Sequence, residues 1–352
     1  MDTECENALA LSKSLTFKIT QGVKIGINVV GILLLIVLFV KVKNTRKIGL
    51  VHFNLRFIII CHYVFVFINC VTMTGTQVLD IARLTNDHKN PCDYLIPIWA
   101  AFLIRSTYSL CVLGETLTIA LISIERIIAC FVKNYDSKTV KIVPICVFVV
   151  MLFILIALLY VWCGTIFSWD RKIAAFNFQT EETATFLQIL AIIILAMELI
   201  SIVYYHIMYV FNKRDYNRQI RLEGAQKSRM LKSLSEKYKM EETRRTVEFL
   251  LPIVWIHFIT ILLNYAGYLG TFLIFKSPTF VELQIIYEAQ TLHVFYPALL
   301  SLVGLWQIKR RFVHVVDVSV TEKDLAADKN ELYYQRMNEL FQSGPFQNLS
   351  RK

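Results

Sequence analysis

The sequence is poor in charged residues and contains none of the short motifs that mark common enzyme classes. Only 18% of its 352 residues are Asp, Glu, Lys or Arg, and 56% are hydrophobic, whereas a soluble domain is about a quarter charged. It has no His-Glu-x-x-His metal motif, no Gly-x-Ser-x-Gly turn and no glycine-rich phosphate loop. We therefore expect neither an enzyme nor a cofactor, and the apolar composition favours a membrane protein.

A buried zinc hydrolase would also need several histidines that converge on one open coordination site. The candidates, His62, His206 and His257, each stand alone in their apolar run. We expect these histidines to be hydrogen-bonded packing residues and predict no metal site.

Long apolar runs dominate the chain. A run of about 20 apolar residues crosses the hydrocarbon core of a bilayer as a helix, and a helix satisfies its own backbone polar groups without water. The sequence therefore predicts an all-α membrane protein, a bundle of seven transmembrane helices. The runs are Val23–Val40, Phe57–Thr74, Ile98–Ile124, Ile142–Cys163, Ala184–Phe211, Phe249–Phe275 and Leu283–Ile308.

Lysine and arginine are distributed unevenly among the connections between these runs. About 22 of them lie on one side of the predicted bundle, about half of these in Asn212–Thr246, and about 7 lie on the other side. Because basic residues remain on the cytoplasmic side, the N-terminus is predicted outside and the C-terminus inside. This topology and anionic lipid account for the net charge of +10, so we expect no nucleic-acid partner.

The chain is predicted to form one seven-helix domain over residues 1–316 and a cytoplasmic tail over 317–352. No internal repeat is visible, which counts against a transporter built from duplicated halves. Acidic residues stand where a signal peptide would have its basic start, so we expect the first run to act as an uncleaved signal. In the long inner connection, Leu231, Leu234 and Tyr238 recur at helical spacing, which predicts that Met230–Val247 extends the sixth helix.

Three cysteines are expected on the oxidising outer side: Cys5, Cys92 and Cys163. A disulfide between Cys92 and Cys163 would tie the long outer loop, Gly75–Pro97, to the top of the fourth helix. Because three cysteines leave one unpaired, the pairing stays undetermined and free thiols are the alternative.

Ionisable residues inside the runs are few, and an ionisable side chain in a membrane span is a functional candidate. Arg105 and Glu288 are predicted at similar depth, so we expect them to form an ion pair. The functional interpretation is a ligand pocket between the third, fifth, sixth and seventh helices, and the alternative is interhelical hydrogen bonding that fixes the bundle. His257, Tyr265 and Gln290 are weaker candidates. The candidate ligand-binding residues are Arg105, Glu115, Glu198, Asn264, Glu288 and His293.

Glu125-Arg126 stands at the inner end of the third helix and is a candidate signalling switch. A carboxylate can hold the arginine while the bundle is closed, and breaking that pair would free the sixth helix to move outward. Glu125 itself is one possible partner, and Glu241, Glu242 or Glu248 at the inner start of the sixth helix is another. The alternative is an arginine whose side chain reaches the lipid headgroups. Pro252 and Pro297 are expected to kink the sixth and seventh helices.

Two segments resemble nematode serpentine chemoreceptors of the alpha superfamily. Glu125-Arg126-Ile127-Ile128-Ala129 resembles their Glu-Arg-x-x-Ala element, and Leu234–Glu242 resembles the Leu-Ser-x-x-Tyr-Gln-x-x-Glu-Asn signature before helix six. The nearest class is epsilon, on the strength of Asn212–Tyr216. Lys239 and Thr243 depart from the signature, at its glutamine and asparagine positions.

The resemblance implies a G-protein-coupled chemosensory receptor in the plasma membrane of sensory neurons, including their cilia. Its expected partners are a heterotrimeric G protein, a small external molecule and the lipid bilayer, with a receptor oligomer as a further option. The alternative function is a seven-helix transporter or ligand-gated channel that needs no G protein.

Overall fold

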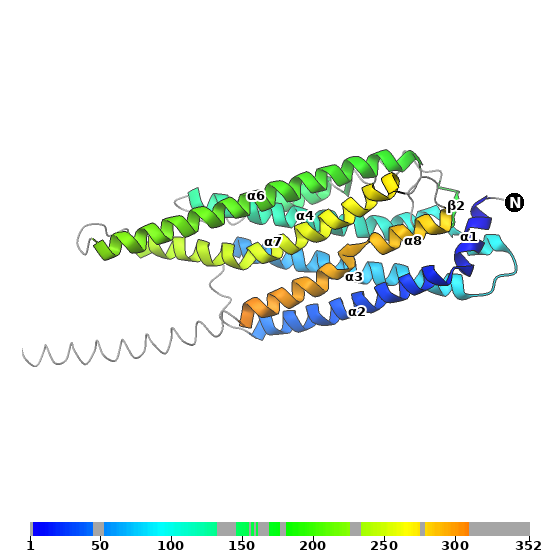
Figure 1. Ribbon diagram of the computed structural model, residues 1–352, viewed down its shortest axis with the longest axis horizontal. Coiled ribbons are helices and arrows are strands. Elements are labelled where there is room, and N and C mark those ends of the chain that lie inside the picture. Colours follow the sequence, from blue (N-terminus) through cyan, green and yellow to red (C-terminus); the bar gives the residue numbers. More distant parts are fainter. Residues whose placement is uncertain are drawn as a thin grey trace, which may run out of the picture. The chain divides into compact units, whose positions relative to one another are not determined.

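The computed structural model is almost entirely helical (Figure 1). It describes residues 3–44, 53–131, 146–154, 156–157, 160, 169–176, 181–225, 234–274 and 279–309. The contacts divide the chain into two units, Met1–Val303 and Gly304–Lys352. The predicted boundary between domain and tail, at residues 316 and 317, lies outside the described residues.

Six helical stretches in the described part of the chain are long and apolar enough to cross a membrane. They correspond to the first, second, third, fifth, sixth and seventh predicted spans. The fourth predicted span, Ile142–Cys163, lies largely outside the described residues, although residues 146–154 are helical. The six stretches are Leu15–Val42, Asn54–Thr85, Ile98–Ile128, Gln188–Phe211, Thr246–Gly267 and Phe280–Lys309.

The helices extend beyond the apolar runs that predicted them. The second was expected to end at Thr74, but α3 continues to Thr85, because the polar side chains of its last turns, Gln77 and Asp80, are buried against neighbours rather than solvated. The predicted extension of the sixth helix is confirmed from Leu234 onward. The long helices are α2 (Leu15–Asn44), α3 (Phe53–Thr85), α4 (Ile98–Phe131), α6 (Glu181–Ala225) and α7 (Leu234–Ile274).

Helix α4 is the most buried of the candidate spans. In its most apolar window 67% of the residues are buried, against 28% for α2. Its inward face packs against α3 and α6. Gly114 permits close approach to α3, because a Cβ at this position would lie 2.7 Å from the Phe65 ring. Polar side chains on α4 are therefore placed at the centre of the bundle.

The predicted last helix, Leu283–Ile308, is interrupted, which corrects the sequence prediction. It consists of α8 (Phe280–Gln290), a 3-10 turn η3 (Leu292–Phe295) and a helix over residues 296–309. Pro297 lacks the N–H that would bond the carbonyl of His293, and that carbonyl accepts from the N–H of Tyr296 instead. The start of α8 is fixed by Thr279 and Glu282, which form a capping box.

One end of the bundle is covered by short elements, and we call it the disulfide end after the Cys5–Cys92 bond. It comprises α1 (Thr3–Lys13), η2 (Pro91–Tyr94), and strands β1 (Ile96–Pro97) and β2 (Lys172–Ile173), which pair antiparallel. Helix α1 lies beside β2 at this end (Figure 1). Its residues Ala8 and Leu11 are buried in one cluster with Leu84 and Tyr94.

The observed disulfide corrects the predicted one. Cys92 is bonded to Cys5 on α1, not to Cys163, and Cys163 itself lies outside the described residues. No helix was predicted before Val23, so the proximity of Cys5 to Cys92 could not be inferred. The bond links the N-terminal helix to the segment between α3 and α4.

Candidate functional site

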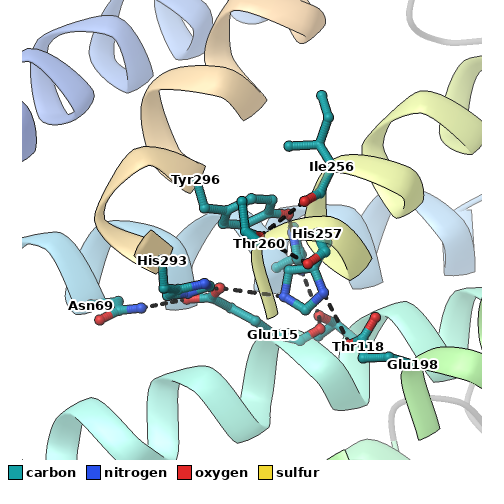
Figure 2. Close-up of polar contacts among 10 residues, drawn as sticks. Asn69, Glu115, Thr118, Glu198, Ile256, His257, Thr260, His293 and Tyr296 are labelled. Carbon is teal, nitrogen blue, oxygen red and sulfur yellow. Dashed lines mark hydrogen bonds and ion pairs between the residues drawn. The ribbon is translucent and has the colours of Figure 1, made fainter. Parts of the chain in front are cut away.

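Polar side chains from five elements meet in the middle of the bundle, and we call them the central cluster. Its members in Figure 2 are Asn69 of α3, Glu115 and Thr118 of α4, Glu198 of α6, His257 of α7, His293 of η3, and Tyr296. His62 of α3 joins them through contacts with Thr118 and Tyr296. The two carboxylates and three imidazoles are each at most 3% exposed. Ionisable groups so deeply buried need partners, because desolvation is costly.

Glu115 is the residue that joins most of the cluster. Its Oε1 accepts a hydrogen bond from Asn69 Nδ2 at 2.9 Å. Its Oε2 lies 2.9 Å from His293 Nε2 and 3.6 Å from His257 Nε2. One carboxylate on α4 therefore contacts α3, α7 and η3 at the same time.

His257 lies between two carboxylates. Its Nδ1 is 2.9 Å from Glu198 Oε1, and its Nε2 faces Glu115. Both contacts satisfy the distance for an ion pair, but neither has the directional geometry of a hydrogen bond. The imidazole of His257 on α7 thus lies between a carboxylate of α4 and a carboxylate of α6 and contacts both.

The 3-10 turn explains why His293 and Tyr296 point into the cluster together. Side chains at i and i+3 eclipse in a 3-10 helix, and these two rings stack with centroids 5.3 Å apart and an interplanar angle of 17°. The Tyr296 hydroxyl lies 2.6 Å from His62 Nε2. His62 Nδ1 is in turn 2.8 Å from Thr118 Oγ1, which also donates to the Glu115 carbonyl.

This arrangement links several helices through polar side chains. Glu115, Glu198, His257 and His293 contact one another inside the bundle, and each comes from a different element. Among the described residues no group of three or more His, Cys, Asp or Glu side chains is arranged to hold a metal ion. The contacts that the structure does show here are hydrogen bonds and ion pairs between helices.

The sequence identified part of this cluster. Glu115, Glu198 and His293 were predicted as site residues, and the structure brings them together, although a role in ligand binding remains a prediction. Asn264 is half-buried about two turns from His257 on α7 and contacts none of these residues.

Sequence reasoning undervalued the histidines and missed Asn69 and Tyr296. His62 and His257 were expected to stand alone, but their ring centroids are 5.8 Å apart, and those of His257 and His293 are 6.0 Å apart. The one signal in the sequence was that His62, His257 and His293 each lie in an apolar run. That signal does not show that the three side chains meet in the folded bundle.

A second polar group lies nearer the disulfide end. Glu288 of α8 pairs with Lys24 of α2, which was not among the predicted site residues. The predicted Arg105–Glu288 pair is thus replaced by Lys24–Glu288. Arg105 instead lies with its guanidinium carbon 5.1 Å from the Tyr108 ring centroid and Nη1 4.0 Å from the Met73 sulfur.

A small cavity of about 10 Å³ is bordered by residues of both groups. Asn69 and His293 line it from the central cluster, and Met73 and Tyr108 line it from the neighbourhood of Arg105. This volume holds about one water molecule. In this conformation a larger ligand would have to displace side chains.

Glu125 and Arg126 form a buried pair toward the opposite end of α4. Arg126 Nε lies 2.5 Å from Glu125 Oε2, and Nη2 lies 2.7 Å from Oε1. The guanidinium therefore folds back onto the preceding residue, one of the partners considered from the sequence. Glu248 is exposed on α7, and the side chains of Glu241 and Glu242 are outside the described part of the chain.

The comparison with known families agrees with this architecture. The family model of the serpentine type 7TM GPCR receptor class ab chemoreceptors matches residues 2–342. The resemblance to serpentine chemoreceptors is confirmed, whereas the epsilon class is not, because the matching class is ab. No curated protein matches the chain.

Proposed function

Because this chain belongs to the serpentine class ab family of seven-helix chemoreceptors, we propose that it detects a small external molecule and activates a heterotrimeric G protein. The family implies both kinds of partner. The observation that carries the proposed mechanism is the central cluster, in which Glu115, His257 and Glu198 connect α4, α7 and α6.

The proposed signal begins with a ligand that changes the contacts of His293. Since His293 and His257 share the Glu115 carboxylate, a change at one ring alters the attraction at the other. Pro252 lies one and a half turns from His257 on α7 and interrupts the helical hydrogen bonding there. Movement of α7 about this proline would separate its Leu234 end from α4.

Glu125 and Arg126 are the proposed switch at the G-protein end. Arg126 is 2% exposed in this conformation, so its guanidinium is not available to a partner protein. Release from Glu125 would expose it beside α6 and α7, where Tyr205, Val247 and Leu250 form the surrounding core. Glu241, Glu242 and Glu248 are proposed as alternative partners during this exchange.

The charge distribution supports an N-terminus outside the cell, a seven-helix domain over 1–316 and a cytoplasmic tail over 317–352. The covered disulfide end would then face the exterior, an oxidising environment that suits the Cys5–Cys92 bond. We place the receptor in the plasma membrane, with sensory cilia as the specific site.

The switch role is tested with Arg126→Ala carrying an N-terminal epitope, in cells with a G-protein reporter. The expected result is normal surface labelling without permeabilisation and loss of ligand-stimulated signalling. Lys89→Ala, an exposed change at the disulfide end, is the control and should signal normally. An Arg126→Ala protein that signals like the wild type would remove the switch, and membrane current without a G protein would favour the transporter or channel alternative.

A further inference from the structure

The disulfide-end half of the bundle contains a layer of five ionisable side chains, each of which has an electrostatic interaction with at least one other member. They are Lys24, Asp80, Arg83, Arg105 and Glu288. Two pairs account for four of them, since Lys24 pairs with Glu288 and Arg83 Nη2 lies 2.7 Å from Asp80 Oδ1. The layer contains three cations and two carboxylates, and the extra cation is Arg105.

Arg105 forms no hydrogen bond to a carboxylate within the described ranges. It lies on the inward face of α4, one and two turns beyond the buried residues Phe102 and Ile98. Its contacts are the Met73 sulfur and the Tyr108 ring. The carboxylates of Glu288 and Asp80 attract it electrostatically without a direct contact, and each is already paired with another cation. A bound anion of one negative charge would balance the excess cation within the membrane span.

The two residues that contact Arg105 also line the cavity. Asn69 and His293, each 3% exposed, line the same cavity. Asn69 Oδ1 and His293 Nδ1 have no hydrogen-bond partner among the residues that the structure describes. The lining thus combines two residues that contact the excess cation, two residues with unpaired polar atoms, and the apolar residues Val294 and Pro297.

We propose that the receptor's ligand is a small organic monocarboxylate whose acid group pairs with Arg105 and whose uncharged part extends along Met73 and Tyr108 toward Asn69 and His293. This inference rests on the proposed receptor function and names its ligand class. The guanidinium fork matches a carboxylate with two parallel hydrogen bonds. Met73 is unbranched and flexible, so it can move aside as the ligand enlarges the cavity.

A ligand in this position would act directly on the central cluster. A hydrogen bond from its uncharged part to His293 Nδ1 would compete with the present orientation of that ring, whose Nε2 is held by Glu115. The acid group would provide binding affinity through Arg105. The uncharged end would reorient the His293 ring and so change the contact between Glu115 and His257 on α7.

The first test measures binding without any G protein. The purified full-length receptor is heated with hexanoate, octanoate or phenylacetate, and with their methyl esters and primary amides. We expect at least one acid, but neither its ester nor its amide, to raise the melting temperature. The acid should bind Arg105→Gln roughly 10- to 100-fold more weakly, Arg105→Lys with an intermediate affinity, and the control Lys89→Gln normally.

The second test uses no ligand. Arg105→Met should melt at a higher temperature than the wild type, because it removes an unpaired cation from the bundle. The proposal is overturned if Arg105→Met melts at the same or a lower temperature, if no acid stabilises the receptor, or if esters and amides stabilise it as well as the acids. An acid that binds but evokes no G-protein signal would leave the ligand class standing and refute the proposed signalling function.

Discussion

The disulfide end and the central cluster are both rich in buried polar groups, but they are held together in different ways. At the disulfide end, Cys5–Cys92 is covalent, and Arg83 donates to the backbone carbonyls of Tyr94 and Ala174. In the central cluster, the contacts between helices join one side chain to another, as between Glu115 and His257. A covalent bond and backbone contacts fix segments in place, whereas side-chain contacts change when a rotamer changes.

From this difference we propose separate tasks for the two regions. The disulfide end would act as a frame that holds α1, β1 and β2 over the bundle, and the central cluster would be the part that rearranges. A switch needs contacts whose alternatives differ by only a few kcal/mol. We propose that His257, which contacts both Glu115 and Glu198, is the residue whose contacts change between the two states.

Glu115→Ala should have the largest effect, because it breaks the central cluster at the residue with most partners. It leaves Asn69, His257 and His293 without the carboxylate that they share, and we expect a loss of about 3–5 kcal/mol in the free energy of unfolding. Thermal unfolding of the purified receptor measures it. Glu6→Ala, which removes an exposed acid on α1, should change stability by less than about 0.5 kcal/mol. Equal effects of the two changes would show that the cluster does not stabilise the bundle.

Cys92→Ser should cause the second-largest loss of stability, because it removes the disulfide bond at the disulfide end. Closing the loop between residues 5 and 92 is expected to stabilise the fold by about 2–4 kcal/mol. The double variant with Cys5→Ser should match each single variant, whereas Cys146→Ser, at an exposed free cysteine, should have no effect. Non-reducing peptide mapping after proteolysis checks the pairing directly. A Cys92–Cys163 peptide would restore the bond predicted from the sequence.

The structural features that could be predicted from the sequence are those that depend on a local pattern of residues. Apolar runs predicted most of the candidate spans because a helix in lipid needs only length and hydropathy. The Arg126–Glu125 contact was among the predicted options, since the two residues are adjacent. The break before Pro297 was expected as a kink, but the 3-10 turn that places His293 was not.

What the sequence could not provide is which helices face one another. Lys24 lies 264 residues from Glu288, and no pattern within α2 distinguishes it from a lysine at the membrane surface. His257 looked structural for the same reason, because its importance comes from Glu115 and Glu198 on two other helices. The Cys5–Cys92 bond depends on α1, whose sequence has no long apolar run.

Gly114→Ala is expected to have the smallest of the three effects on stability. It tests whether the close packing of α3 on α4 positions the central cluster. The new methyl group would lie 2.7 Å from the Phe65 ring, so α3 and α4 must separate or the ring must move, at a cost of about 1–3 kcal/mol. Gly75→Ala is the matched control, since a Cβ there meets nothing within 4 Å and alanine favours a helix by roughly 0.5–1 kcal/mol over glycine. Because Gly114 adjoins Glu115, its substitution should also shift the Asn69–Glu115 contact and alter signalling, while Gly75→Ala leaves signalling unchanged. If Gly114→Ala unfolds and signals like Gly75→Ala, close packing of α3 on α4 is not what positions the central cluster.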